Sequence, residues 1–267
     1  MSLLQYHAFH LVTISPWPLL ISFATFALLL GLVVIFKGIN MSLGLALFLI
    51  GLISIILISA QWWRDVIREA LYEGCHTAKV QHGLKIGFIL FIISEIMLFI
   101  SFFWAFFHSS LSPTIEIGCI WPPAGLKVLN TWSIPLLNTM ILLFSGATIT
   151  QAHQLMLFGN YIETLFYLII TVNFALFFTG LQLHEYIHAP FDISDGIYGS
   201  VFYMLTGLHG SHVLVGTIFI LVCLFRHIYK HFTRTHHLGF EAAIWYWHFV
   251  DVVWLFLFIF IYWWGNA

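Results

Sequence analysis

Two acidic side chains stand alone inside long apolar stretches of this sequence. Glu95 lies within Ile86–Phe107 and Asp251 lies within Ala242–Trp264, and neither stretch contains another Asp, Glu, Lys or Arg. A carboxyl group in lipid costs a few kcal/mol unless it is protonated or paired inside the protein. Each is therefore a candidate proton or ion site, and the alternative is a hydrogen bond that holds two helices together. His248 lies three residues before Asp251, on the same helix face, which predicts an internal Asp–His pair.

A second candidate site uses two of the 15 histidines. His184 and His188 are four residues apart with Glu185 between them, which is the spacing of helical zinc proteases. Pro190 disfavours helix at the residue before it, so the helix should end near His188 and leave the pair at the membrane interface. There, histidines more often bond headgroups, water or backbone. An intramembrane zinc metalloprotease, with Asp251 as a distant third ligand, is kept as the alternative function.

Basic side chains gather beside two of the apolar stretches. They are Arg64, Arg68, Arg226 and Lys230, with His76 and His231 nearby in the sequence. Arginine at a membrane face binds phosphate through paired hydrogen bonds, so these residues predict recognition of a phospholipid headgroup. The simpler alternative is that they set the topology and pair locally, for example Arg64 with Asp65.

The composition indicates that these groups lie in a lipid environment. Hydrophobic residues make up 61% of the 267 positions and charged residues only 7%, with 9 Lys and Arg against 11 Asp and Glu. Soluble domains carry about 25% charged residues. So few charges exclude a soluble globule, a disordered chain and a nucleic-acid binder, which needs a basic patch. The chain is expected to lie in a bilayer.

Seven apolar stretches are long enough to cross a bilayer as helices, which takes about 20 residues each. They span residues 17–36, 41–63, 86–107, 134–158, 164–183, 197–225 and 242–264. Lipid cannot satisfy backbone hydrogen bonds and no strand-like alternation is visible, so the predicted fold class is all-α: a polytopic membrane protein forming a single domain over residues 1–267. Gly83 and Gly87 form a GxxxG pattern, which predicts close helix packing.

The distribution of Lys and Arg predicts the orientation. Seven of them flank the even-numbered linkers and two flank the odd-numbered ones. Positive residues favour the cytoplasm-equivalent side, so the N-terminus is expected there and the C-terminus on the opposite side. Residues 1–12 contain no Lys or Arg, which argues against a cleaved signal or a transit peptide.

Several motifs resemble subunit III of the aa3-type cytochrome c oxidases, in particular the mitochondrial form. The matching segments run in family order and are Trp62–Asp65, Ser94–Glu95, Phe103–Leu111, Trp121–Pro123, Pro135–Thr139, Ala189–Phe191, Asp195–Ser200, Gly207–His212, Gly239–Ala242 and Trp245–Trp254. The most specific is the last, WYWHFVDVVW. The first sixty residues match in hydropathy and in the Ser15–Pro18 entry to the first stretch.

The resemblance implies a fold and site residues that composition does not. It implies two helices and then five, arranged as a V whose cleft holds structural phospholipids. The positions that match the family's headgroup-binding residues are Arg64, His76, Arg226 and His231. Glu95 matches the family's carbodiimide-reactive carboxyl. The implied chain binds no haem or copper, which belong to the partner subunits.

The resemblance also implies a function and a location. The chain would be a non-catalytic core subunit of the oxidase, respiratory complex IV, which passes electrons from cytochrome c to oxygen and pumps protons. It would support proton uptake, stability, and lipid and oxygen access of subunit I. Its expected partners are subunits I and II, accessory subunits and a supercomplex with the cytochrome bc1 complex. The expected place is the mitochondrial inner membrane, with the N-terminus in the matrix and the C-terminus in the intermembrane space.

Overall fold

A computed structural model describes residues 7–266, and regular structure in this part of the chain is helical throughout. Seven helices are long and apolar enough to cross a membrane, which agrees with the predicted fold class. The elements are α1 Trp17–Phe36, α2 Met41–Leu71, α3 Ala78–Leu111, η1 Ile115–Ile117, α4 Ile134–Phe158, α5 Tyr161–His188, α6 Gly196–Ile228, α7 Leu238–Leu257, η2 Phe258–Trp263 and η3 Trp264–Asn266.

The helix boundaries differ from the predicted ones in a consistent direction. The stretches 17–36 and 134–158 match α1 and α4. The helices predicted at 41–63, 86–107, 164–183 and 197–225 all extend further, because hydropathy marks where the apolar residues end and not where backbone hydrogen bonding ends. The stretch predicted at 242–264 begins earlier, at Leu238, and its α-helix stops at Leu257, after which the chain continues as the wider π-helical η2 and the short 3-10 helix η3.

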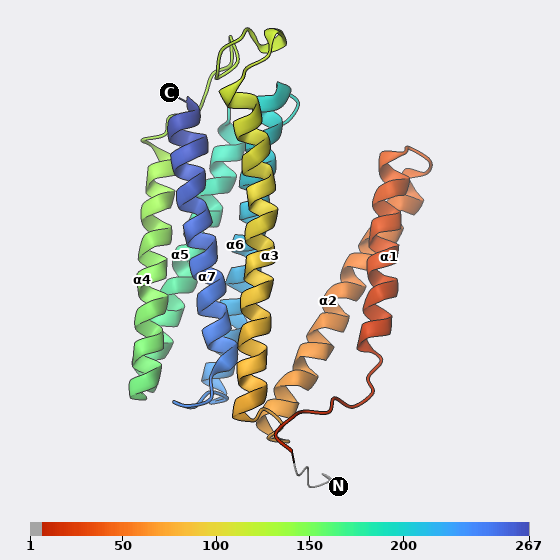
Figure 1. Ribbon diagram of the computed structural model, residues 1–267, viewed down its shortest axis with the longest axis vertical. Helices are drawn as coiled ribbons and strands as arrows, with labels where there is room; N and C mark the ends of the chain where they lie inside the picture. The colour runs from red at the N-terminus through yellow and green to blue at the C-terminus, as the bar shows by residue number, and fades with distance from the viewer. Residues whose placement is uncertain (1–6, 267) are drawn as a thin grey trace. The chain divides into compact units, whose positions relative to one another are not determined.

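The described chain divides by its internal packing into two compact units, one ending at Leu84 and one beginning at Lys85. The first holds α1, α2 and the start of α3, and the second holds the rest of α3 with α4 to α7. Within each unit Figure 1 shows the arrangement plainly: α1 lies beside α2, and α3 to α7 form a bundle of neighbouring helices.

Glycines bring α1 and α2 into backbone contact within the first unit. A Cβ atom added at Gly31 would lie 2.5 Å from the backbone nitrogen of Phe48, and one at Gly51 would lie 2.5 Å from that of Leu28. Neither position has room for a side chain. By contrast, a Cβ at Gly83 or Gly87 meets no atom of the described chain within 4 Å, and the packing predicted from that GxxxG pattern stays a prediction. The pattern fixes the spacing of small residues and not whether a helix faces them.

The core of the second unit is built around α7. Trp247 and Trp254 are among the largest fully buried side chains, and each indole forms a hydrogen bond with a hydroxyl group on α4. The Nε1–H of Trp247 donates to Oγ of Ser145 over 2.9 Å, and that of Trp254 donates to Oγ1 of Thr139 over 2.9 Å. A buried indole N–H needs such a partner because lipid offers none. These bonds set the register of α7 against α4.

Candidate functional site

Glu95 of α3 has a partner on α6 within the second unit. Its Oε2 lies 2.8 Å from Nε2 of His212. Nδ1 of the same imidazole lies 2.8 Å from the backbone carbonyl oxygen of Leu208. A charged or polar group inside a membrane helix is tolerated when another group in the bundle pairs with it, and this contact supplies that pairing.

The hydrogen-bond geometry determines how many protons the pair holds. The carbonyl oxygen of Leu208 has no hydrogen, so Nδ1 of His212 must be the donor there. Nε2 then either carries a proton and donates to a carboxylate, or accepts a proton from a neutral carboxyl group of Glu95. In both arrangements a single proton lies between Oε2 and Nε2, and the pair as a whole is neutral. The membrane therefore contains no net charge at this point.

Aromatic rings enclose this Glu–His pair. The ring centre of Phe99 lies 5.0 Å from that of His212, Phe249 lies at 5.9 Å and Tyr246 is stacked at 6.3 Å. The His212 side chain is 10% exposed and that of Glu95 22% exposed. The rings come from α3 and α7, so three helices define the surroundings of one proton. The arrangement can hold and exchange a proton with a group that reaches the exposed edge of Glu95.

Asp251 is buried on α7, and its histidine neighbour lies farther away than that of Glu95. Its Oδ2 lies 3.8 Å from Nδ1 of His248, which is ion-pair range but too long for a hydrogen bond. Instead, Nε2 of His248 lies 3.1 Å from the hydroxyl of Thr150 on α4. Oδ1 of Asp251 has no hydrogen-bond partner among the described residues. The predicted shared helix face is confirmed, but the hydrogen-bonded Asp–His pair is not formed.

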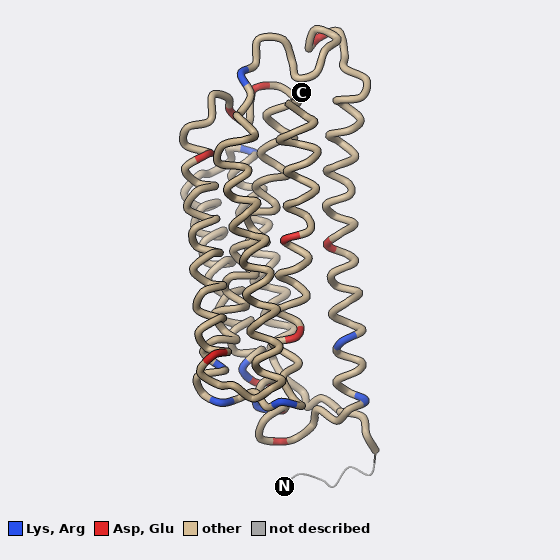
Figure 2. The backbone as a smooth tube through the Cα atoms, turned by 90° about the vertical axis from the view of Figure 1, so that its left-hand side faces the viewer, with Lys and Arg blue, Asp and Glu red and all other residues tan. Residues whose placement is uncertain are grey.

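A second candidate site lies at the end of the second unit where α4 and α6 end, and Figure 2 shows Lys and Arg gathered there. The guanidinium carbon of Arg226 lies 4.4 Å from the ring centre of Phe232, and its Nε atom is buried without a hydrogen-bond partner. No carboxylate of the described chain forms an ion pair with Arg226. Nδ1 of His231 is likewise buried without a partner. The Nε–H of Arg226 is thus available to an anion, and Nδ1 of His231 is a second donor when it carries a proton.

The protonation of His231 depends on its burial and on the nearby charge of Arg226. Burial lowers the pKa of His231, and the positive charge of Arg226 beside it lowers the pKa further. The imidazole is therefore mostly neutral at pH 7. A phosphate bound between the two side chains would oppose the charge of Arg226 and favour the protonated form.

The other two predicted headgroup residues lie in the first unit and already have contacts. Arg64 donates two hydrogen bonds, of 3.0 and 2.9 Å, to Oδ1 of Asp65, as the local alternative predicts. Asp65 also accepts the indole N–H of Trp17 over 2.8 Å, which joins the start of α1 to α2. His76 lies with His10 and Glu69, and one ligand atom of each falls within 4.8 Å of the others.

The histidine motif does not form the predicted protease site. Helix α5 ends at His188, as predicted, and His184 and His188 are exposed. Glu185 points elsewhere: it is 3% exposed, and its Oε1 accepts hydrogen bonds from Tyr262 over 2.6 Å and from Gln182 over 3.3 Å. Neighbouring residues point about 100° apart around a helix, and Glu185 follows His184 directly. The carboxylate of Glu185 therefore faces the core, while the imidazoles of His184 and His188 face outward.

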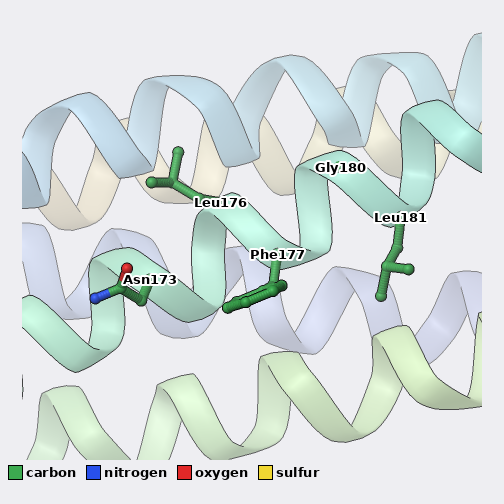
Figure 3. Close-up of a pocket in the computed structure, with 5 residues that line it drawn as sticks. All are labelled: Asn173, Leu176, Phe177, Gly180 and Leu181. Carbon is green, nitrogen blue, oxygen red and sulfur yellow. The ribbon is translucent and has the colours of Figure 1, made fainter.

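Helix α5 also carries a shallow surface depression, shown in Figure 3. Its lining residues are Asn173, Leu176, Phe177, Gly180 and Leu181. The amide of Asn173 donates to the carbonyl of Ile169 in its own helix over 2.9 Å. The depression contains no titratable side chain, and its apolar residues suit acyl chains better than a reaction.

Comparison with known proteins covers the whole described chain. A family model for cytochrome c oxidase subunit III matches residues 7–266. The protein named cytochrome c oxidase subunit 3 in Prototheca wickerhamii is 60% identical over 261 residues, covering 98% of this chain and 99% of that one. The proteins of the same name from Marchantia polymorpha and Branchiostoma lanceolatum are 58% and 54% identical, covering 100% and 98% of both chains respectively.

The chain belongs to the cytochrome c oxidase subunit III family. It is therefore a subunit of cytochrome c oxidase, and the resemblance read from the motifs is confirmed. The protease alternative is not retained, because no finding supports it and because Glu185 is bonded to Tyr262 away from the two histidines.

The sequence does not predict the partners of Glu95 and Glu185 in this subunit III chain. Glu95 and Asp251 were found because charges are rare in the spans. Nothing in the sequence linked Glu95 to His212, 117 positions away, or Glu185 to Tyr262. The one available signal was that His212 also lies deep within an apolar span.

Proposed function

We propose that this chain is a non-catalytic core subunit that supports subunit I of the oxidase. In this proposal it binds no haem or copper itself, and the redox centres belong to subunits I and II. It supports proton uptake into the proton-pumping enzyme, lipid and oxygen access, and resistance to inactivation. The observation that carries the proposal is the end-to-end match to one family at up to 60% identity.

Removal of this chain from the purified oxidase tests the proposal. We expect the haem spectra of the remaining complex to be unchanged, while activity decays faster during turnover. The measurement is the absorption spectrum together with the number of turnovers before half of the activity is lost. Loss of the haem spectra while the haem-bearing subunit is still present would contradict a supporting role, and an unchanged lifetime would contradict the protective role.

The proposal includes structural phospholipids held by Arg64, His76, Arg226 and His231. Arg226 and His231 support it most, since their buried nitrogen atoms lack partners in the described chain and no carboxylate neutralises the guanidinium. Arg64 contributes less, because Asp65 already occupies two of its donors. A phosphate group matches these donors in charge and geometry.

Arg226→Gln is expected to weaken retention of a bound phospholipid about tenfold to hundredfold, because a hydrogen bond to a charged group contributes roughly 1.5–3 kcal/mol. The measurement is phospholipid per oxidase, by mass spectrometry, during a series of detergent washes. The matched control is Lys230→Gln, which removes an exposed positive charge nearby. Equal lipid loss from both variants would assign the effect to general charge rather than to a headgroup site.

We also propose the location and partners. The chain lies in the mitochondrial inner membrane with its N-terminus in the matrix, next to subunits I and II and accessory subunits, in a complex that joins the cytochrome bc1 complex. The basic residues at one end of the second unit support this orientation (Figure 2). Glu95 and Asp251 are proposed as its functional intramembrane carboxyl groups, and Glu95 has the better support because its pair with His212 holds an exchangeable proton.

A further inference from the structure

Three potential metal ligands converge at one end of the second unit, away from Glu95. They are His153 on α4, His237 immediately before α7, and Glu241 in the first turn of α7. One ligand atom from each lies within 4.8 Å of the other two. His237 is 5% exposed, and His153 is partly buried. Nothing in the proposed supporting role uses these side chains.

The spacing of the ligand atoms matches a tetrahedral metal ion. Nε2 of His153 and Nε2 of His237 are 3.4 Å apart, and Nε2 of His237 is 3.6 Å from Oε1 of Glu241. Zinc–nitrogen bonds of about 2.0–2.1 Å in tetrahedral geometry place two ligand atoms about 3.3 Å apart. These two distances are thus within a few tenths of an ångström of that spacing, and the ligand atoms of His153 and Glu241 lie within 4.8 Å of each other. Two imidazoles and one carboxylate are ligands that zinc accepts, with a fourth position left for water.

The hydrogen bond on the far side of His237 fixes the tautomer that a metal needs. Its Nδ1 lies 2.9 Å from the backbone carbonyl of Thr233, so Nδ1 carries the proton and Nε2 presents a lone pair in the neutral ring. Metal-binding histidines typically have such an outer hydrogen bond, which orients the ring. His153 must release the proton that lies between the two Nε2 atoms, or move it to Nδ1, when an ion binds.

Lys85 of α3 is the group that competes with a metal here, because its ammonium group forms an ion pair with Oε2 of Glu241. The other oxygen, Oε1, faces His237. The carboxylate can thus bind an ion through Oε1 while Lys85 stays on Oε2, but the ammonium charge repels the ion. The site is expected to bind zinc less tightly than a site without this lysine.

We propose that His153, His237 and Glu241 form a binding site for a divalent cation of the zinc class, moderated by Lys85. A bound ion would join α4 to the start of α7 and would neutralise Glu241, so α7 would be held at its first turn by coordination in addition to the ion pair with Lys85. The proposal stands on the side chains of this chain and does not depend on the supporting role.

Zinc binding to the intact purified oxidase tests the proposal, after treatment with a chelator. The difference in zinc bound between the wild-type complex and one carrying His237→Ala isolates this site from metals in other subunits. We expect one zinc fewer per complex in the His237→Ala and Glu241→Gln variants, and an affinity at least about a hundredfold lower. The control is His184→Ala, which removes an exposed histidine and should leave the stoichiometry unchanged.

Two further measurements keep the test decisive if a variant assembles poorly. Cobalt(II) added to the wild-type complex should give the intense visible absorption of tetrahedral coordination, which Glu241→Gln should lose. Lys85→Met should bind zinc about tenfold more tightly, because a positive charge beside the site is gone. Equal zinc in the wild-type and His237→Ala complexes, only weak six-coordinate cobalt absorption, or unchanged affinity in Lys85→Met would overturn the proposal.

Discussion

Replacing His212 by leucine should open the second unit about a hundred times more often than in the wild-type subunit. The substitution leaves Glu95 inside the membrane without its partner, and breaking a buried pair from one side costs about 3 kcal/mol, at the low end because Glu95 is partly exposed. A difference of 1.4 kcal/mol is about tenfold in an equilibrium constant. The neutral, one-proton pair is therefore predicted to be a main determinant of the α3–α6 contact.

The buried thiol of Cys223 on α6 provides the measurement. It is 1% exposed, so a thiol reagent reaches it when the bundle opens. In oxidase whose Cys75 and Cys119 are serine, the rate of labelling of this chain reports the opening. Glu95→Gln is the matched control, because its amide can still donate to Nε2 of His212, and its rate should stay within about threefold of the wild type. Labelling of His212→Leu at the wild-type rate would show that the pair does not hold α3 to α6.

A single methyl group at Gly51 should disrupt the pairing of α1 and α2. The Cβ of Gly51→Ala would lie 2.5 Å from the backbone nitrogen of Leu28 and 2.7 Å from its Cα. Backbone atoms cannot rotate away, so the two helices must separate, and overpacking of this kind costs about 1–3 kcal/mol. We expect the α1–α2 pair to open about fivefold more often or more.

A cysteine placed at Ala24, on the buried face of α1, reports this opening through its labelling rate. The matched control is Gly83→Ala, since its Cβ meets no atom within 4 Å. Alanine favours helix over glycine by about 1 kcal/mol, so the control should not increase labelling. If both alanine variants label Ala24→Cys at the same rate, the backbone contact at Gly51 contributes nothing to the pairing.

The close approach of α1 and α2 is a helix contact that short sequence motifs do not predict. Gly83 and Gly87 have the spacing associated with packed membrane helices, yet no atom of the described chain approaches them. Gly31 and Gly51 lie on different helices and form no local pattern, yet they make the contact. A short motif reports which residues are small, whereas packing depends on which faces meet, and that depends on the whole chain.

The ion pairs and hydrogen bonds of the acidic side chains show the same division. Arg64 and Asp65 are neighbours in sequence, and their pairing was predictable. Glu95 with His212, Lys85 with Glu241 and Glu185 with Tyr262 join positions far apart in the chain. Asp251 and His248 share a helix face, as their spacing requires, but Thr150 on α4 takes the hydrogen bond of the imidazole.

The sequence by itself determined that this protein lies in a membrane, crosses it as seven helices, carries isolated carboxyl groups at depth and belongs to the subunit III family. Those properties follow from composition, hydropathy and local motifs, because lipid leaves a backbone few choices. Only the tertiary structure decided which groups satisfy the buried acids, which glycines allow backbone contact, and which histidines converge on a carboxylate. These are relations between distant positions, and they arise when helices pack side by side.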